Sequence, residues 1–402
     1  MTAFPPRWDV CQLGDVVDIL DSRRIPLNAT ERASRSGDVP YYGATGQVGW
    51  IDMPIFDEPL VLLGEDGVQF FEASKQKAYL IDGPAWVNNH AHVLRARPEV
   101  ERRFLSYYLN AADYRGLANG TTRLKLTQAA MKQIPVPLPP LDEQRQIVDL
   151  LEDHLSRLDA ANAYLGSTRR RLVTMERSAL DSLFGGPEVP LAELIDNISA
   201  GRSFGGASAP AGIDEWGIIK VSAMTWGEFD AAENKAVSSD HVDRRFEIRE
   251  GDLLVSRANT DEYVGASVLV GPVRPKLLLS DKSLRLSPVG GVRAEWLWRA
   301  LQAPSARRQI SARATGTKDS MRNISQASLK HVRVPQAGID EQETAVRTFA
   351  EITTVVGRLR ADVRRAEARS GALRRSLLAT AFSGRLTASS AVPPAASEIN
   401  YA

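Results

Sequence analysis

The chain has 402 residues, of which 43% are hydrophobic and 25% are charged, and its formal net charge is +1. This balance is typical of a folded, water-soluble protein and excludes one that binds nucleic acid through its overall charge. The absence of a long apolar run, of a signal peptide and of any cysteine besides Cys11 favours a reducing cytoplasm and excludes an internal disulfide.

A first globular domain is expected over residues 1–138. Short β-branched runs between glycine and aspartate turns predict strands, for example at 60–63 and 91–94. A helix is predicted at 100–109. The fold class of this region is therefore α+β, with a mixed, mainly antiparallel sheet.

A long helix is expected within residues 139–186. Apolar residues recur in alternating steps of three and four, which is the seam of a coiled coil. The seam includes Leu151, Leu158, Leu165 and Leu172. Pro139-Pro140 precede the helix and Gly185-Gly186-Pro187 follow it, as helix boundaries require. At 1.5 Å per residue such a helix is roughly 65 Å long.

The second half of the chain repeats this order. A second α+β domain is expected over 187–336, with strands at 252–256 and 266–270 and a helix at 294–301. A second helix is expected within 337–386, and its seam includes Phe349, Val356, Leu359 and Val363. The tail 387–402 is rich in Ala, Ser and Pro and is expected to be disordered.

An internal repeat underlies this order. The segment from Gln128 through Asp142-Glu143-Gln144 recurs from Gln326 through Asp340-Glu341-Gln342, and the register then holds without a gap to Phe184 and Phe382. Inserting a residue would rotate an apolar seam away from its partner, so the missing gaps indicate that the two helices bury each other. We therefore expect a pseudo-twofold protein in which two domains are separated by two long antiparallel coiled-coil helices, suited to a two-part target.

Searches for catalytic motifs find little. There is no G-x-x-x-x-G-K-[ST] loop, and the glycine-rich run 43–49 does not match G-x-G-x-x-G. Glu233-Asn234-Lys235 resembles part of a nuclease site but has no convincing Pro-Asp partner upstream. His90-Ala91-His92 has a zinc-like spacing without further ligands. The sequence predicts no catalytic site and no metal site.

Two local basic segments favour nucleic acid. Residues 114–133 carry basic residues and no acid, and residues 297–331 carry many basic residues against Asp319 alone. Each contains a Gly-Thr pair, Gly120-Thr121 and Gly316-Thr317, at the same place in the repeat. A solvated basic loop is the alternative, but its recurrence favours phosphate binding. The expected phosphate contacts are Lys125, Arg313, Lys318 and Arg322.

The repeated pattern resembles a known family. A domain that ends Ile134-Pro135-Val136-Pro137-Leu138-Pro139-Pro140-Leu141-Asp142-Glu143-Gln144 before a long helix, all duplicated, resembles the specificity (S) subunit of type I restriction-modification systems. Segments 40–46, 64–67 and 86–94, and 251–260 and 279–286, are similar to target recognition domains. One departure is that the second linker lacks the double proline.

The resemblance implies a non-catalytic DNA-recognition subunit. Each domain would read half of a bipartite double-stranded DNA target, and the two conserved spacer helices would set the distance between the halves. The helices would also dock two methyltransferase subunits, which carry S-adenosylmethionine and methylate adenine. Two restriction subunits, with ATP and Mg²⁺, would join them for phage defence in a bacterial or archaeal cytoplasm. The chain itself would bind no cofactor.

Candidate base-reading residues are polar side chains within the recognition-domain segments. They are Tyr42, Thr45, Asn88, Asn89 and His90 in the first domain, and Arg202, Lys220, Arg257, Asn259, Thr260 and Lys282 in the second. Structural roles are the alternative: Tyr42 in the core, the asparagines as turn formers, and Arg257 in an ion pair with Asp261 or Glu262.

Two other functions remain open from the sequence. A coiled-coil adaptor that tethers two proteins would explain the helices but not the recurrent basic segments. A subunit that works with a methyltransferase and no nuclease would look the same in this chain. The sequence does not determine the target bases, the spacer length, the subunit stoichiometry or which polar residues contact bases rather than phosphates.

Overall fold

The computed structural model describes residues 4–203, 209–225, 227–239, 242–318 and 321–388. The chain divides into two compact units. Unit 1 comprises the described residues up to Gly166 and those from Arg364 onward, and unit 2 is Ser167–Val363. Each long helix thus contributes to both units, and the domain boundaries expected from the sequence remain predictions. In the described part of the chain, none of the helices combines the length and apolar character that a membrane span needs.

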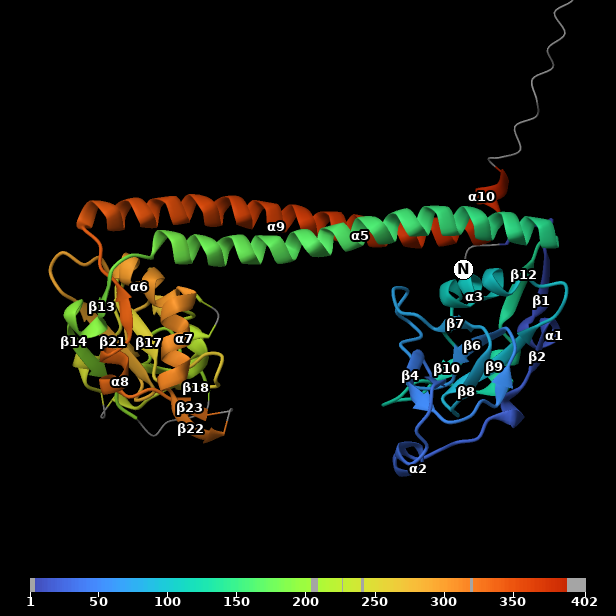
Figure 1. Cartoon of the computed structure of the whole chain (residues 1–402), viewed down its shortest axis with the longest axis horizontal. Coiled ribbons are helices and arrows are strands. Elements are labelled where there is room, and N and C mark those ends of the chain that lie inside the picture. The colour runs from blue at the N-terminus through green and yellow to red at the C-terminus, as the bar shows by residue number, and fades with distance from the viewer. Residues whose placement is uncertain (1–3, 204–208, 226, 240–241, 319–320, 389–402) are drawn as a thin grey trace, which may run out of the picture. The chain divides into compact units, whose positions relative to one another are not determined.

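Unit 1 contains two four-stranded sheets (Figure 1). One has the order β2-β9-β6-β7 and is antiparallel; the other has the order β4-β3-β8-β5, with β3 parallel to β8. The elements are β1 (Asp9–Gln12), α1 (Leu13–Val16), β2 (Val17–Ile19), η1 (Asp21–Arg23), α2 (Ala29–Ala33), β3 (Val39–Gly43), β4 (Gly46–Ile51), β5 (Phe56–Asp57), β6 (Leu60–Gly64), β7 (Ala78–Ile81), β8 (Pro84–Val87), β9 (Ala91–Ala96), α3 (Arg102–Ala111), β10 (Ala118–Asn119), β11 (Lys125–Leu126), α4 (Gln128–Lys132) and β12 (Pro135–Leu138).

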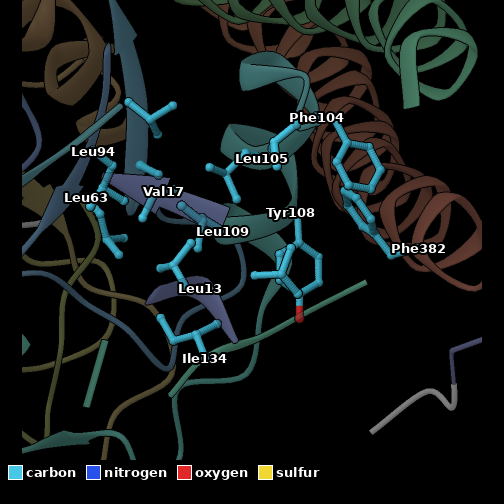
Figure 2. Packing of buried hydrophobic residues seen from close by; sticks show 14 of the residues in the cluster. Leu13, Val17, Leu63, Leu94, Phe104, Leu105, Tyr108, Leu109, Ile134 and Phe382 are labelled. Atoms are coloured by element: carbon cyan, nitrogen blue, oxygen red, sulfur yellow. The ribbon is translucent and has the colours of Figure 1, made fainter. Parts of the chain in front are cut away.

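The core of unit 1 lies between the antiparallel sheet and α3. Every residue of β6 is buried, as expected for a central strand covered on both faces. Figure 2 shows Leu105 and Leu109 of α3 on the side of the strands, whereas Phe104 and Tyr108 face Phe382 of the second long helix. The ring of Phe382 lies 5.5 Å from that of Phe104 and 5.3 Å from that of Tyr108. One apolar cluster therefore joins sheet, α3 and long helix.

Unit 2 repeats this topology. Its antiparallel sheet has the order β14-β21-β17-β19, and its smaller sheet β16-β15-β20 also has a parallel pair, β15 with β20. The elements are β13 (Glu188–Pro190), η2 (Leu191–Glu193), β14 (Ile195–Ala200), β15 (Gly217–Ile219), η3 (Val221–Met224), β16 (Asn234–Ala236), η5 (Arg244–Phe246), β17 (Leu253–Ser256), β18 (Ala258–Asn259), β19 (Ser267–Leu269), β20 (Leu277–Leu278), β21 (Ser283–Pro288), α6 (Ala294–Gln302), α7 (Pro304–Arg313), β22 (Thr315–Lys318), β23 (Met321–Asn323), α8 (Gln326–Lys330) and β24 (Arg333–Pro335).

The two Gly-Thr motifs belong to hairpins. Gly120 lies between β10 and β11 with φ of 144°, and Gly316 lies in β22 with φ of 145°. A Cβ at Gly120 would lie 2.1 Å from the Arg123 carbonyl oxygen, and one at Gly316 would lie 2.5 Å from that of Met321. Only glycine fits both the backbone angle and the close approach. The recurrent motif is thus explained by a hairpin in each unit.

The long helices are α5 (Leu141–Leu183) and α9 (Ile339–Phe382), and α10 (Arg385–Ala388) follows. In unit 1, Asp159 pairs with Arg374 and Glu143 with Thr387, both at 2.6 Å. In unit 2, Glu176 pairs with Arg360 at 2.6 Å, and Phe184 contacts Phe349 at a ring distance of 5.7 Å. As α5 numbers rise the partner numbers fall, so the helices pack antiparallel within each unit. The expected fold class, α+β domains with two long antiparallel helices, is confirmed.

The predicted seam needs one correction. Leu151, Leu172, Phe349, Val356 and Val363 are buried, and Leu158 and Leu165 are half-buried. Leu359 is instead 42% exposed. One residue further along, Arg360 occupies the inward position and reaches Glu176. An ion pair therefore replaces the apolar contact at this level of the helix pair.

The expectation of disorder is wrong for residues 387 and 388. Disorder was expected from Thr387, but α10 includes this residue. The Thr387 side chain is buried and its hydroxyl donates to Glu143. Residues 389–402 lie outside the described part of the chain.

Candidate nucleic-acid interface

The candidate residues of unit 1 meet where β3, β6 and β8 end. The Asn88 N–H donates to the Tyr42 carbonyl at 3.0 Å, and the His90 N–H donates to the Asn88 side chain at 2.8 Å. The Glu65 N–H, directly after β6, donates to the His90 carbonyl at 2.7 Å. Consecutive backbone contacts thus bring Tyr42, Asn88 and His90 to one edge of the sheets. Asn88 itself is buried and shapes this turn, because its side chain holds the backbone of His90.

Contacts of Asp66 and Glu65 with the β10–β11 hairpin extend this edge. The His90 Nδ1 atom lies 2.9 Å from Asp66, and Arg123 of the hairpin lies 2.6 Å from the same carboxylate. The His90 ring remains 40% exposed and Arg123 60% exposed. Lys125 pairs with Glu65 at 3.0 Å. The basic segment is therefore anchored on two acidic residues, and part of its positive charge is already balanced.

A buried network lies beneath the edge. His92 Nδ1 lies 2.6 Å from Asp21, and its Nε2 lies 2.9 Å from the Leu126 carbonyl oxygen. Both ring nitrogens face acceptors, so both can donate only when the imidazole carries two protons. Burial raises the pKa of the Asp21 carboxyl, but hydrogen bonding and charge from His92, with a smaller contribution from Arg24, leave that pKa below its usual range.

Glu65 completes the network. Arg24 lies 2.8 Å from Glu65 and 3.4 Å from Asp21. Burial raises the pKa of the Glu65 carboxyl, but hydrogen bonds from Arg24 and Lys125 outweigh it and the pKa is lowered. Possible metal-ligand atoms of Asp21, Glu65 and His92 lie within 4.8 Å of one another. Arg24, which pairs with both carboxylates, and Lys125 already supply the positive charge that a cation would bring, so the cluster is a salt-bridge network.

The remaining candidates of unit 1 have different surroundings. Thr45 and Asn89 are exposed in turns. Ala44, beside Thr45, lies close to the end of β6, since a Cβ on Gly64 would lie 2.8 Å from its carbonyl oxygen. Tyr42 is half-buried with its ring 5.9 Å from that of Tyr79, so part of its surface belongs to the core.

Unit 2 builds the same edge with different side chains. The Arg257 N–H donates to the Lys282 carbonyl at 2.8 Å, and the Arg257 carbonyl accepts from Ile324 at 2.9 Å. In unit 1 the Glu65 carbonyl likewise accepts from Leu126 at 2.7 Å. Arg257 therefore stands where unit 1 has Glu65, and Lys282 stands where unit 1 has His90. The side chains of Arg257 and Lys282 are exposed, and neither has an ion pair among the described residues.

Asn259 and Thr260 follow directly. The Asn259 Oδ1 atom accepts the Thr260 N–H at 2.8 Å, whereas its Nδ2 atom is buried without a partner among the described residues. Asn259 pairs with Arg322 in the β18–β23 ladder. Arg322 donates to the Ala314 carbonyl at 2.8 Å and lies 3.4 Å from Asp261. Asp261 thus pairs with Arg322, and the Arg322 guanidinium is largely committed to its own hairpin.

A cavity of about 360 Å³ adjoins this edge in unit 2. Lys220 and Lys282 line it, together with Lys235, Asp281, Ser203, Ser280, Ile218, Ile219 and Val221. Lys220 also lies 3.9 Å from Glu233. Arg202 is exposed, and its N–H donates to the Leu279 carbonyl at 3.3 Å, close to the cavity. Four of the six candidates of unit 2, Arg202, Lys220, Arg257 and Lys282, are therefore neighbours.

The second basic segment divides into structural and accessible residues. Arg299 stacks on Trp298, 3.6 Å from the ring centroid, and Arg307 donates to the Val264 carbonyl at 2.8 Å. Burial lowers the pKa of both guanidinium groups. Arg313 is half-buried at the end of α7 and donates to the Gln309 carbonyl at 3.2 Å. The Lys318 side chain lies outside the described part of the structure.

Sequence reasoning missed several residues of these edges. Glu65 and Asp66 lie in the segment 64–67, which resembles recognition domains, but neither was among the candidate residues. Lys235 was weighed only as part of a nuclease-like triplet. Strand pairing of Lys235 with Ile218 brings it to the cavity. Lys235 alternates with the buried Asn234 in the short strand β16, and this alternation was the only signal for the position of Lys235.

Comparison with known proteins points to one family. The model of the type I restriction modification DNA specificity domain matches residues 5–163. A putative type I restriction enzyme specificity subunit of Haemophilus influenzae is 36% identical over 141 residues, which are 35% of each chain. This chain is thus similar to the type I restriction-modification specificity subunits. The EcoKI specificity subunit of Escherichia coli is 24% identical over 323 residues, covering 74% of this chain and 68% of that relative.

Coverage differs among the relatives. The matches span only about a third of the Haemophilus relative and 30% of the EcoEI specificity subunit of Escherichia coli. Solved structures match over more of the chain. One from a study of type I R-M complex assembly and conformational transition has a TM-score of 0.70 at 18% identity, covering 95% of this chain and 99% of that chain. The HsdS subunit of Thermoanaerobacter tengcongensis has a TM-score of 0.53 at 18% identity, covering 95% and 98%. These structures share the fold.

Proposed function

We propose that this chain is a specificity subunit that reads a bipartite double-stranded DNA target, with one half read by each globular domain. The observation that carries the proposal is the recurrence of one polar strand edge with its basic hairpin in both units, around residues 64–67 and 88–90 and around residues 257–260 and 280–282. Exposed donors and acceptors at such an edge suit base edges, and the basic hairpins suit phosphates. The chain itself catalyses no reaction in this proposal.

Partner subunits supply the chemistry. The long helices set the spacing between the half-sites and dock two methyltransferase subunits, which bind S-adenosylmethionine and methylate adenine in each half. Two restriction subunits, which use ATP and Mg²⁺, join through them in the cytoplasm. Exposed apolar side chains on the helices support docking, because they are costly to leave in water. They are Tyr164, Val173 and Met175 on α5 and Val355, Leu359 and Leu373 on α9.

The experiment is single-molecule methylome sequencing of a host that expresses the chain with its methyltransferase subunit. A split motif with one methyladenine on each strand is the expected result. If the methyltransferase is active and bound but no split motif appears, the chain is instead an adaptor between proteins. The restriction subunit is tested separately, by challenging the same host with phage in its presence and absence.

A further inference from the structure

The two recognition edges have the same backbone but opposite electrostatic character. Ile218 of unit 2 pairs with Lys235, and Tyr42 of unit 1 pairs with Gln47. When Ile218 is aligned with Tyr42, Lys235 corresponds to Gln47. The backbone contacts of Lys282 match those of His90. Unit 1 thus has Gln47 and His90 where unit 2 has two lysines.

Acidic residues show the reverse pattern. Glu65 in unit 1 corresponds to Arg257 in unit 2. Asp66 corresponds to Ala258, because each forms the next backbone bridge to its hairpin, Asp66 with Lys125 and Ala258 with Asn323. One edge therefore has carboxylates where the other has a guanidinium and a methyl group. The two edges cannot present the same hydrogen-bonding pattern to DNA.

The cavity of unit 2 concentrates donors. Among the described residues, Lys220, Lys235 and Lys282 line it with one carboxylate, Asp281, over a floor that includes the buried Ile218 and Ile219. An ammonium group donates hydrogen bonds and accepts none. In the major groove guanine offers two acceptors, O6 and N7, while its partner cytosine offers one amino donor. Because Lys220 lies near Glu233, Lys235 and Lys282 are the two donors that match guanine, and Asp281 is the acceptor that matches cytosine.

Other base pairs fit less well. An A·T pair also offers two acceptors and one donor, but its adenine amino donor lies between N7 and the thymine O4, so one of two adjacent ammonium groups would face that donor. A phosphate would match the lysines but has no use for Asp281, whose charge would repel it. We propose that the lysine-lined cavity of unit 2 reads a G·C pair in one half of the target, with lysines on guanine and Asp281 on cytosine. This inference rests on the proposed function.

The test uses the full-length chain purified with its methyltransferase subunit and a duplex DNA library with randomised half-sites. Bound sequences are compared for the wild type, for Lys282→Gln and for Lys235→Gln. Lys75→Gln is the matched control, because Lys75 is also exposed but does not line the cavity and lies outside both basic segments. We expect each cavity variant to lower the preference for guanine at one position of one half about tenfold, and the control to leave it unchanged.

The outcomes separate the two proposals. If the wild type enriches no two-part sequence, the proposed function fails. If it enriches a two-part sequence but neither cavity variant changes a guanine preference, only the G·C inference fails. Equal weakening on all sequences with a shallower salt dependence would assign the lysines to phosphates and overturn the inference. Circular dichroism of each variant checks its fold, and two separately substituted lysines ensure that one misfolded variant does not decide the result.

Discussion

Gln144 and Gln342 make the same three hydrogen bonds in the two units. Gln144 accepts the Glu101 N–H at 2.8 Å and donates to the Glu99 and Pro139 carbonyls at 3.0 and 2.8 Å. Gln342 accepts the Arg293 N–H at 2.8 Å and donates to the Gly291 and Ala337 carbonyls at 3.0 and 2.8 Å. Both side chains are buried. The glutamine of the repeated Asp-Glu-Gln segment therefore fastens each long helix to its globular domain.

Replacing either glutamine should loosen one unit. Gln144→Leu leaves one buried and two part-buried backbone groups without partners, and we expect it to lower the free energy of unfolding by about 3 kcal/mol. Urea unfolding followed by fluorescence measures this loss. Arg145→Ala is the control, because its neighbouring side chain is exposed and pairs only with Asp142; it should cost less than about 0.5 kcal/mol. A Gln144→Leu variant as stable as the control would refute the anchoring role.

Phe382 and Phe184 occupy equivalent positions of the repeat but belong to different units. Phe382 contacts Phe104 and Tyr108 in unit 1, whereas Phe184 contacts Phe349 in unit 2. Truncating either to alanine should cost its own unit about 3 to 4 kcal/mol through the lost ring and the cavity left behind. Hydrogen exchange resolved by peptide should show lower protection in unit 1 for Phe382→Ala and in unit 2 for Phe184→Ala. The same pattern in both variants would contradict this assignment.

Acid should destabilise unit 1 through Asp21 and Glu65. Both carboxyls have a pKa below their usual range in the folded chain. Their contribution to the free energy of unfolding is therefore fully present above the unfolded pKa of about 4, and it is lost as the pH falls through the lower folded pKa. Thermal unfolding between pH 7 and 3 should show this loss below about pH 4. Asp21→Asn should cost about 3 kcal/mol at pH 7 and flatten the dependence, since His92 and Arg24 lose a buried partner. An unchanged pH profile for this variant would exclude the role of Asp21.

Asn259 should contribute to specific binding. Its side chain is partly exposed and its Nδ2 atom has no partner among the described residues, so a rotation of the side chain can present the amide to an adenine or guanine acceptor. We expect Asn259→Ala to weaken binding to the methylated motif by about 1 to 3 kcal/mol while leaving non-specific duplex binding nearly unchanged. Fluorescence anisotropy on both DNAs measures the difference. Equal losses on the two duplexes would argue against base reading.

Shortening both helices should shorten the target gap, if the proposed function holds. Deleting residues 161–167 together with 367–373 removes one heptad from each helix and keeps the seam in register. The helices become shorter by about 10 Å, which corresponds to about three base pairs at ~3.4 Å per base pair. Methylome sequencing reads the new gap. An unchanged gap in an assembled, active complex would show that the helices do not set the spacing.

Removing the heptad from α5 alone is the matched control for this change. The apolar positions of α5 then lose their register against those of α9, so we expect loss of stability or of assembly. Size-exclusion chromatography with the methyltransferase subunit distinguishes these results from a shortened gap.

Several features followed from the sequence by itself, because they depend on local pattern. The three-and-four spacing from Leu151 to Leu172 specifies a helix whatever surrounds it, and the ungapped repeat required both helices to keep one register. Strands such as β6 and β17 were recognisable from short apolar runs between turn residues. The Gly-Thr pairs marked two turns, because glycine is needed wherever φ is positive and backbone approaches backbone; that each turn belongs to a hairpin came from the structure.

Other features were decided only by the tertiary structure, because they depend on contacts between distant segments. Whether a basic residue is accessible depends on its neighbours: Arg307 donates into its own fold, whereas Arg257 is exposed. Glu65, far from Lys125 and Arg24 in sequence, becomes their shared partner through strand pairing. Leu359 satisfied the heptad spacing, yet the Arg360–Glu176 pair takes its place in the seam. Sequence period determines which elements form, and three-dimensional packing determines which of their side chains remain accessible.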